Sequence, residues 1–276
     1  MKYLISIVII TATFFIGRQF SDDKSYENRY ESYELVWEDD FEKPGMPDPE
    51  KWSYDTAGNS WGWGNNELQH YTFKDPENVR VEDGVLYIQA KKEPINQKKY
   101  SSVRLITKNK GDWKYGRVDV MAKLPEGRGL WPAIWMLPTN NTYGNWPQSG
   151  EIDIMEHVGY NPDTVFATAH TEAYNHSIGT EKSKGKFVEN VYDDFHEYSL
   201  EWTPEAYHVY MDGDLFFTFN NENKTSAQWP YDQPFYLIIN LAVGGNWGGR
   251  HGVDTTAFPA ELAIEYVRVY QKKELE

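Results

Sequence analysis

The chain contains no cysteine among its 276 residues. This absence excludes disulfide bonds, a thiol nucleophile, thiolate metal sites and a lipid anchor on an N-terminal cysteine. Positive charge is also scarce, because 27 Lys and Arg accompany 42 Asp and Glu and give a formal net charge of −15. A nucleic-acid backbone attracts proteins of the opposite charge, so we expect no nucleic-acid partner. A neutral polymer is compatible with this charge.

A long hydrophobic run is missing at the N-terminus. Residues 3–16 are uncharged and follow Lys2, but they number only 14. A membrane-spanning helix needs about 20 apolar residues, whereas a shorter run after a positive charge is typical of an export signal. We predict a signal peptide over residues 1–17, a secreted or periplasmic protein, and no stable membrane insertion after cleavage. An uncleaved anchor is the alternative.

The next segment has the composition of a flexible leader. Residues 18–33 carry seven charged side chains and no aliphatic one, and such a segment cannot bury enough apolar surface to fold. From residue 34 to residue 272 no Pro-rich or Ser-rich linker and no internal repeat interrupts the chain. We therefore predict a leader over 18–33, a single domain over 34–272, and a monomer.

Helical periodicity is not sustained anywhere for 12 residues. Instead, two pairs of alternating runs surround Asp-Gly dipeptides, in Val79–Ala90 and in Tyr207–Phe219, and this pattern is typical of β-hairpins. Many short strands without alternating helices predict an all-β fold, an antiparallel β-sandwich or jelly roll. Further strands are expected at Tyr115–Leu124, Ile152–Val158, Val165–His170, Phe235–Ala242 and Ala263–Tyr270.

Aromatic residues are abundant, with 11 Trp, 20 Tyr and 13 Phe. Large β proteins use many Tyr and Phe in their cores, which accounts for much of this number. Tryptophans flanked by Gly and Asn are less easily explained by a core. They indicate exposed flat rings, on which the apolar face of a sugar can stack.

The segment 150–159 (GEIDIMEHVG) carries three acids in a short strand. Alternation places Glu151 and Asp153 on one face, but it would place Met155 rather than Glu156 beside them. One extra residue near Ile154 and Met155 would correct the phase, and β-bulges do this beside active sites. We therefore predict a bulged strand with three acids on one face.

Three neighbouring carboxyl groups resist joint ionisation, so at least one should hold a proton near neutral pH. Glycoside hydrolysis needs this division, with one ionised acid as nucleophile and one protonated acid as proton donor. A solvated acidic face or a calcium site is the alternative for the bare pattern. The pattern alone thus favours catalysis by two carboxyl groups.

The acid strand resembles that of glycoside hydrolase family 16 in its bulged E-x-D-x-x-E form. Other segments are similar to the laminarinase branch of that family, which acts on β-1,3-glucan, and the resemblance extends from about Leu35 to Gln271. These segments are Trp61–Tyr71, Gly129–Pro138, Ala167–His176, His196–Trp202, Asn240–Gly249 and Glu265–Gln271. The resemblance implies a jelly roll whose concave sheet carries the substrate cleft.

The resemblance also implies roles for single residues. Glu151 matches the nucleophile, Asp153 the assisting acid and Glu156 the general acid/base of a retaining double displacement. His170 matches a supporting histidine, which a hairpin return would place opposite the acids. No cofactor is required for this chemistry.

The expected sugar-binding residues come from several segments. Trp131 and Trp135 are four residues apart, so a strand would place both on one face, although two core tryptophans are the alternative. Asn65 and Arg104 match cleft residues of the family; for Arg104 a surface ion pair is the alternative. Trp247, in a Gly-rich loop, is a candidate platform. Trp61, Trp63 and Trp146 are further candidates.

The family resemblance also implies a structural calcium away from the cleft. Asp40, the backbone carbonyl of Gly84, and Glu265 stand at the matching positions. Family members more often have Glu first and Asp last, and here the two acids are exchanged. Oxygen ligands are nevertheless the kind that calcium prefers.

The sequence thus predicts a secreted enzyme that hydrolyses internal bonds of β-1,3-glucan and accepts mixed β-1,3/1,4 chains. A galactan hydrolase of the agarase or carrageenase type is the alternative, but sulfated substrates call for basic residues that the segments around the acids lack. A non-catalytic β-glucan-binding protein is a third reading. It is disfavoured because all three acids are present.

Overall fold

The computed structural model describes residues 30–273. The predicted signal peptide and most of the predicted leader lie outside these residues. Tyr33–Glu276 form one compact unit. The following description concerns this unit.

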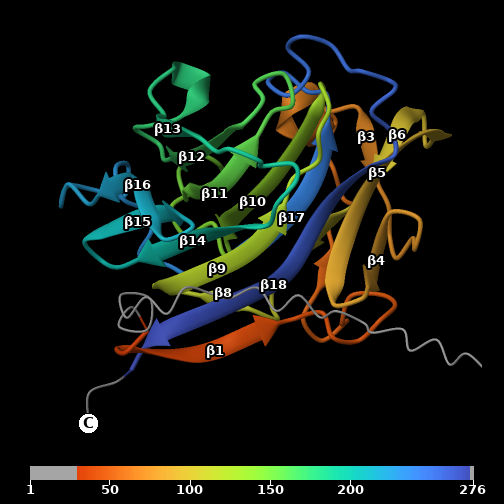
Figure 1. The fold of residues 1–276 in the computed structure, drawn as a ribbon. Helices are drawn as coiled ribbons and strands as arrows, with labels where there is room; N and C mark the ends of the chain where they lie inside the picture. The colour runs from red at the N-terminus through yellow and green to blue at the C-terminus, as the bar shows by residue number, and fades with distance from the viewer. Residues whose placement is uncertain (1–29, 274–276) are drawn as a thin grey trace, which may run out of the picture. The chain divides into compact units, whose positions relative to one another are not determined.

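The described part is built from strands and two short helical segments (Figure 1). None of its helices is long and apolar enough to cross a membrane. The bounds of the strands and helical segments are β1 Tyr33–Asp39, β2 Ser53–Tyr54, η1 Gly62–Asn66, β3 Gln69–Tyr71, β4 Val79–Glu82, β5 Val85–Ile95, β6 Lys98–Ser102, β7 Arg104–Ile106, β8 Asp112–Trp113, β9 Gly116–Lys123, β10 Leu130–Pro138, β11 Glu151–His157, β12 Thr164–His170, η2 His176–Ile178, β13 Lys182–Phe187, β14 His196–Trp202, β15 Ala206–Met211, β16 Asp214–Asn220, β17 Phe235–Val243 and β18 Ala260–Lys272.

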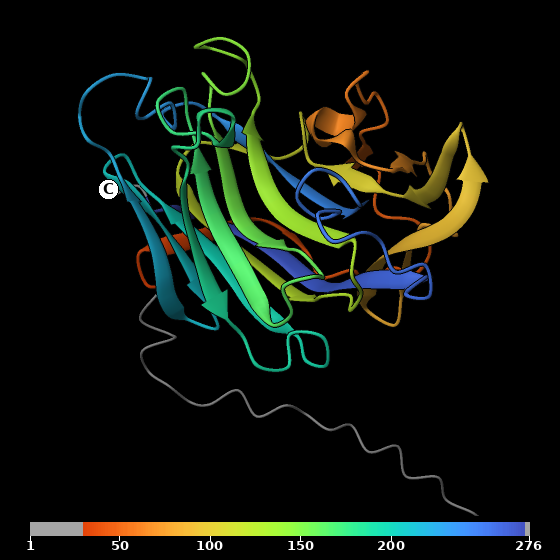
Figure 2. The same ribbon diagram turned by 90° about the horizontal axis from the view of Figure 1, so that it is seen from above.

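The strands form two sheets, which confirms the predicted sandwich. The larger sheet has the order β16-β15-β14-β9-β18-β5-β6-β3, with β1 also on β18 and β4 on β5. The smaller sheet has the order β13-β12-β11-β10-β17-β7-β2, with β8 also on β17. The pairing is antiparallel except between β3 and β6, which run parallel. Figure 2 shows the strands of the smaller sheet bending along their length.

Both predicted Asp-Gly hairpins are present. Asp83 and Gly84 connect β4 to β5 with φ angles of 52° and 78°, and Asp212 and Gly213 connect β15 to β16 with 48° and 83°. Two successive positive φ angles define the type I′ turn, whose twist matches that of the flanking strands. Gly at the second position adopts this conformation without the steric cost of a Cβ atom.

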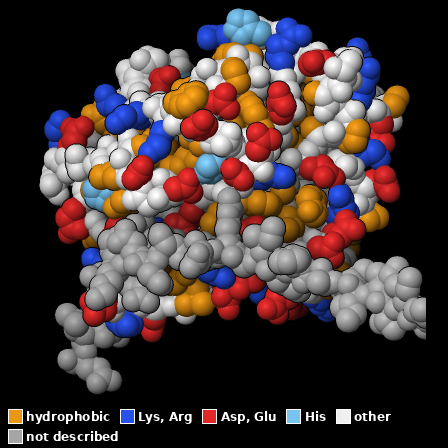
Figure 3. Space-filling model, viewed as in Figure 1, with side chains coloured by type: hydrophobic (Ala, Val, Ile, Leu, Met, Phe, Trp, Pro, Cys, Tyr) orange, Lys and Arg blue, Asp and Glu red, His pale blue; other side chains and the backbone are white. Residues whose placement is uncertain are grey.

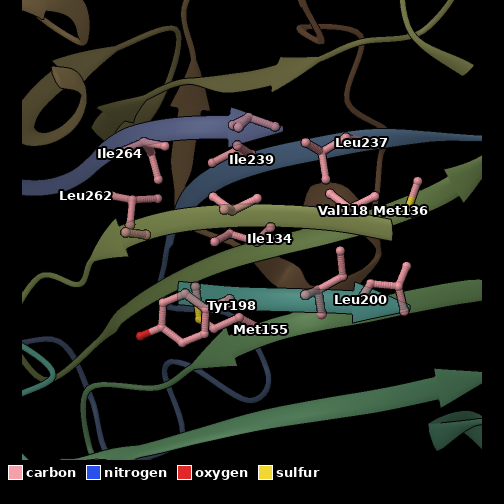
Figure 4. Close-up of a cluster of buried hydrophobic side chains, with 14 of the residues drawn as sticks. Val118, Ile134, Met136, Met155, Tyr198, Leu200, Leu237, Ile239, Leu262 and Ile264 are labelled. Carbon is pink, nitrogen blue, oxygen red and sulfur yellow. The ribbon is translucent and has the colours of Figure 1, made fainter. Parts of the chain in front are cut away.

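The core lies between the two sheets (Figure 4). From the larger sheet it receives residues such as Val118, Leu200 and Ile264, and from the smaller sheet Ile134 and Ile239. Burial of each such side chain contributes about 1.5–3 kcal/mol to stability. Because strand neighbours alternate between faces, this core fixes which side chains of the smaller sheet point away from it.

The surface is acidic, as the composition requires. Figure 3 shows Asp and Glu side chains spread over the face seen in Figure 1, between hydrophobic and uncharged polar groups. This distribution disfavours a polyanionic partner on that face.

Candidate active site

The predicted bulge is present in β11. Across the ladder to β12, Asp153 pairs with Thr168 and Glu156 with Phe166, so two residues of β11 stand opposite one of β12. These two residues, Ile154 and Met155, are fully buried. The extra residue returns Glu156 to the face of Glu151 and Asp153, away from the core.

His170 lies opposite the acids, as its spacing predicts. It pairs with Glu151 across the ladder. Its Nε2 atom is 3.8 Å from Oε1 of Glu151 and 3.5 Å from Oδ2 of Asp153. The ligand atoms of these three residues lie within 4.8 Å of one another, so they could also hold a metal ion. Two of them are the acids that the sequence assigns to catalysis.

The acids share a poorly hydrated environment. Burial, and next the charge of Glu156, raise the pKa of Glu151 to about 8. Burial raises the pKa of Glu156 to about 7 and that of Asp153 well above its usual range. Burial lowers the pKa of His170 to about 3, so its imidazole is neutral. The raised pKa values of the three acids agree with the expectation that at least one of them holds a proton near neutral pH.

Trp131 and Trp135 both lie on the cleft side of β10. The indole Nε1 of Trp131 donates a hydrogen bond of 3.1 Å to Oε1 of Glu156. The indole of Trp135 donates one of 2.7 Å to Oδ1 of Asn240 on β17. The even spacing therefore predicts their common face correctly, and neither belongs to the main core between the sheets.

Arg104 on β7 is buried and sandwiched between aromatic rings. Its guanidinium carbon lies 4.9 Å from the ring centre of Trp63 and 4.7 Å from that of Trp135. Its Nε atom is 3.3 Å from Oδ2 of Asp55. The alternative of a surface ion pair is therefore only partly right, because an ion pair exists but the side chain is 9 % exposed.

The comparisons with known proteins agree with this geometry. The model of glycosyl hydrolases family 16 matches residues 66–267. The chain belongs to glycosyl hydrolase family 16. A beta-glucanase of Rhodothermus marinus is 54% identical over 246 residues, which cover 87% of this chain and 85% of that protein.

Two solved family 16 structures are similar over most of the domain. The laminarinase from Rhodothermus marinus matches with a TM-score of 0.85 and 52% identity, covering 88% of this chain and 98% of that one. A non-specific endo-β-1,3(4)-glucanase, SCLam, matches with a TM-score of 0.84 and 48% identity, covering 88% and 92%. The resemblance of this family 16 chain to the laminarinase branch is thus supported.

In this family 16 domain, Asn65 is joined to the Gly-rich loop that carries Trp247. The backbone N–H of Asn246 donates to the carbonyl of Asn65 at 2.7 Å. The Trp247 ring lies edge-on to Trp131 at 5.5 Å and to Phe166 at 5.3 Å. The structure therefore places Trp247 beside the acids, linked to Glu156 through Trp131.

Trp146, a further sugar-binding candidate, also contacts one of the acids. Its side chain hydrogen-bonds to Glu151 and thereby opposes the rise in the pKa of that acid. Its ring also contacts His176 at 4.9 Å and His170 at 5.9 Å. The signal was its position five residues before Glu151, but the conformation of the intervening loop determines the contact.

Glu67 is a residue near the site that the sequence analysis did not single out. It is 7% exposed, and its Oε2 atom accepts a hydrogen bond of 2.6 Å from the Gln69 side chain. A Cβ atom at Gly245 would lie 3.3 Å from Glu67 Cγ and 3.2 Å from Trp131 Cζ3. Glu67 thus packs beneath the Gly-rich loop that carries Trp247.

The three expected calcium ligands lie at neighbouring positions of the larger sheet. β18 carries Glu265 between β1 and β5; Asp40 directly follows β1, and Gly84 directly precedes β5. Oδ1 of Asp40 also accepts hydrogen bonds from Arg268, with Nη2 at 3.0 Å and Nε at 3.1 Å. Oxygen donors from three segments suit calcium, while the guanidinium competes for one of them. We propose a structural calcium site here.

Proposed function

We propose that this family 16 enzyme is a secreted, retaining endo-β-1,3-glucanase that also accepts mixed β-1,3/1,4-glucan. The observation that carries the proposal is the bulged acid strand, in which Glu156 accepts the indole hydrogen bond of Trp131 and the neutral imidazole of His170 lies beside Glu151 and Asp153. The names of the similar proteins, a laminarinase and an endo-β-1,3(4)-glucanase, support this substrate class.

The first step forms a covalent intermediate. The Glu151 carboxylate attacks the anomeric carbon, its electron pair forms the new carbon–oxygen bond, and the glycosidic bond breaks. Glu156 gives its proton to the departing oxygen. His170 and Trp146 orient the Glu151 carboxylate through the contacts described above.

Substrate must also place the proton on the correct acid. In the free protein the pKa of Glu151 is raised further than that of Glu156. Positive charge that develops at the anomeric carbon favours an ionised Glu151, and the glycosidic oxygen accepts a hydrogen bond from a protonated Glu156. Both effects move the proton toward Glu156.

The second step releases the sugar. Glu156, now ionised, removes a proton from water, and the water oxygen attacks the anomeric carbon. The bond to Glu151 breaks, and the configuration of the substrate is restored. Asp153 stays buried, and His170, which lies near both acids, links Asp153 to Glu151 through both steps.

The cleft chemistry favours a neutral glucan over a sulfated galactan. Arg104 is the cleft arginine, and it is paired with Asp55 and enclosed by Trp63 and Trp135. A sulfate group would have to compete with the Asp55 carboxylate. A flat, uncharged pyranose instead matches the half-buried indole rings of Trp63 and Trp135.

Incubation with laminarin, barley mixed-linkage glucan, agarose and carrageenan, followed by sizing of the products, tests the proposal. We expect short oligosaccharides from laminarin first and from barley glucan second. Release from agarose or carrageenan alone would replace the proposal with the galactan alternative. Binding of laminarin without any cleavage would favour the non-catalytic reading.

Secretion and the oligomeric state have separate tests. We expect the mature protein in the medium or periplasm, with an N-terminus near residue 18, and a monomeric mass in analytical ultracentrifugation. Retention of the full-length chain in the membrane fraction would instead indicate an uncleaved anchor.

A further inference from the structure

Most of the expected sugar-binding residues lie on one side of the acid strand, whereas Trp247 contacts Phe166 of β12 on its other side. Trp131 and Trp135 are on β10, Arg104 is on β7, and Asn65 is in η1, all on the side of β11 that leads to β10, β17 and β7. An enzyme that cuts internal bonds must hold its polymer on both sides of the scissile bond. β12 and β13 form the other half of this sheet beyond β11 (Figure 1), and their outward face is where the rest of the polymer would lie.

Strand alternation identifies which side chains of β12 and β13 face the cleft. Phe166 faces it, because its ring contacts Trp247. Thr164 is two residues away and shares this face, and the register pairs Thr164 with Phe187 and Phe166 with Gly185. We name these four residues, Thr164, Phe166, Gly185 and Phe187, the β12–β13 strip.

The lysines of β13 point away from the strip. Lys182, Lys184 and Lys186 pair with Ala169, Ala167 and Val165, which are fully buried core residues. Lys186 accordingly reaches Asp214 of the other sheet at 3.3 Å. The strip is therefore uncharged, although β13 as a whole is basic.

Gly185 keeps the strip flat. A Cβ atom at this position would lie 3.0 Å from Cε1 of Phe166 and 3.3 Å from Cγ2 of Thr164. The absence of a side chain leaves room for the half-buried Phe166 ring against β13. Phe187 stands next on the strip and is 70% exposed, which is unusual for so large an apolar side chain.

A line of aromatic contacts joins the strip to the proton donor. Trp131 hydrogen-bonds to Glu156, the Trp131 ring meets Trp247, and the Trp247 ring meets Phe166. Glu156 protonates the oxygen of the departing sugar in the proposed mechanism. The strip thus begins at the leaving-group end of the reaction.

We propose that the β12–β13 strip binds the leaving part of the glucan chain, and that an outer sugar of this part stacks on Phe187. The inference rests on the proposed function, because it requires a polymer that is cut internally by a retaining mechanism. The uncharged surface with threonine hydroxyl and phenyl groups suits a neutral sugar. Continuity with the acid face makes the substrate itself, rather than another protein, the occupant.

A transglycosylation experiment isolates the strip from the chemistry of the first step. An aryl β-laminaribioside forms the glycosyl-enzyme without occupying the outer strip, and laminaritriose then competes with water as acceptor. In Phe187→Ala we expect the ratio of transfer to hydrolysis to fall about threefold to tenfold, the range of one lost aromatic contact. Hydrolysis of the aryl substrate without acceptor, measured for each protein, is the reference for this ratio.

Two variants serve as controls. Phe187→Tyr keeps the ring and should restore the ratio of the parent protein. Leu215→Ala removes another exposed apolar side chain, on β16 of the other sheet, and should leave the ratio unchanged. The same ratio in Phe187→Ala as in the parent would overturn the proposal.

Two further outcomes keep the proposal distinct from its alternatives. If Phe187→Ala changed only the mass in analytical ultracentrifugation, Phe187 would be a contact between copies of the chain and the proposal would be wrong. If the parent protein cleaved agarose and not laminarin, the proposed specificity for β-1,3-glucan would be wrong, whatever the role of the strip. The same variants would then be compared with agaro-oligosaccharide acceptors, where a lower ratio would still support the strip.

Discussion

The indole of Trp131 holds the carboxyl group of Glu156 by a hydrogen bond of 3.1 Å. Burial raises the pKa of Glu156 to about 7, and this hydrogen bond opposes the rise because it stabilises the ionised form. Trp131 is 8% exposed and packs edge-on against Trp247, so its indole has little freedom to turn away. The ring thus both lines the cleft and adjusts the acid.

Replacing Trp131 with Phe removes the donor while keeping an aromatic ring. The pKa of Glu156 should rise by about one unit, the effect expected for a lost hydrogen bond to a charged group. The basic limb of the kcat/KM profile on laminarin should therefore move to higher pH. In Trp135→Phe, whose indole donates to Asn240 instead, this limb should stay where it is. An unmoved limb in Trp131→Phe would contradict the coupling.

The roles of the two glutamates can be separated with azide. Glu156→Ala should lose about 10²–10⁴-fold activity on laminarin but retain the first step on an aryl glycoside, because a good leaving group needs no proton. Azide should then restore turnover with a β-glycosyl azide as product. Glu151→Ala with azide should instead give the α-glycosyl azide.

NMR of the azide products and initial rates provide the readout. Glu77→Ala, which removes an exposed acid outside the cleft, is the control and should keep full activity. If the anomeric configurations of the two products were exchanged, the nucleophile and the acid/base would have to be exchanged as well.

Glu151 is expected to reduce stability at high pH. Its pKa is about 8 in the folded protein against 4.5 for an ordinary glutamate, so the folded state binds more protons between these values. The free energy of unfolding should consequently fall as the pH rises through this window. Glu151→Gln cannot ionise and should melt a few degrees above the parent at pH 9, at about 2–4 °C per kcal/mol.

The advantage of Glu151→Gln should shrink as the pH falls to 5, where the parent carboxyl group is protonated. Differential scanning calorimetry at both pH values measures the effect. A difference in melting temperature that is equal at pH 5 and pH 9 would mean that the charge of Glu151 has no part in it.

Arg104→Lys preserves the charge but not the planar group between the two tryptophan rings. Because a guanidinium stacks on aromatic faces better than an ammonium does, Trp63 and Trp135 should lose their fixed positions. We expect KM for laminarin to rise about tenfold, with a smaller change in kcat. Arg80→Lys, which alters an arginine over a tyrosine ring on the larger sheet, is the matched control. Equal KM values in both variants would exclude this role.

Calcium should raise the melting temperature of the parent protein relative to the protein in EDTA. In Glu265→Ala this difference should disappear, because one of the three proposed oxygen ligands is gone. Glu77→Ala should retain it. No effect of calcium on the parent would remove the proposed site.

Much of the acid face follows from local sequence. Alternation fails at Glu156 by one residue, and this failure predicts the bulge that β11 contains. The 14-residue separation between Glu156 and His170 predicts a hairpin return, and His170 indeed pairs with Glu151. Both predictions depend only on the period of two along a strand and on a short connection.

Contacts that depend on loops could not be predicted in this way. Trp146 reaches Glu151 because the loop before β11 brings its ring beside His170, and no local pattern specifies that path. The parallel pairing of β3 with β6 joins segments about 30 residues apart. Parallel strands require such a long crossover, so no short-range pattern in the sequence indicates this pairing. Glu67 looks like a solvated acid in sequence and is buried only because a distant Gly-rich loop covers it.

The bulge also makes β11 unusually tolerant of a change in length. On either side of Ile154 and Met155 the ladder to β12 is regular, so the surplus residue is confined to one point. Removal of that residue would shorten the path between the two catalytic glutamates while leaving both flanks paired with their present neighbours. A deletion elsewhere in the strand would instead exchange its inner and outer faces. Loss or gain of a single codon at the bulge could therefore convert a longer catalytic strand of family 16 into a shorter one, or the reverse. The strand segments on either side of the bulge would keep their core-facing side chains in the core.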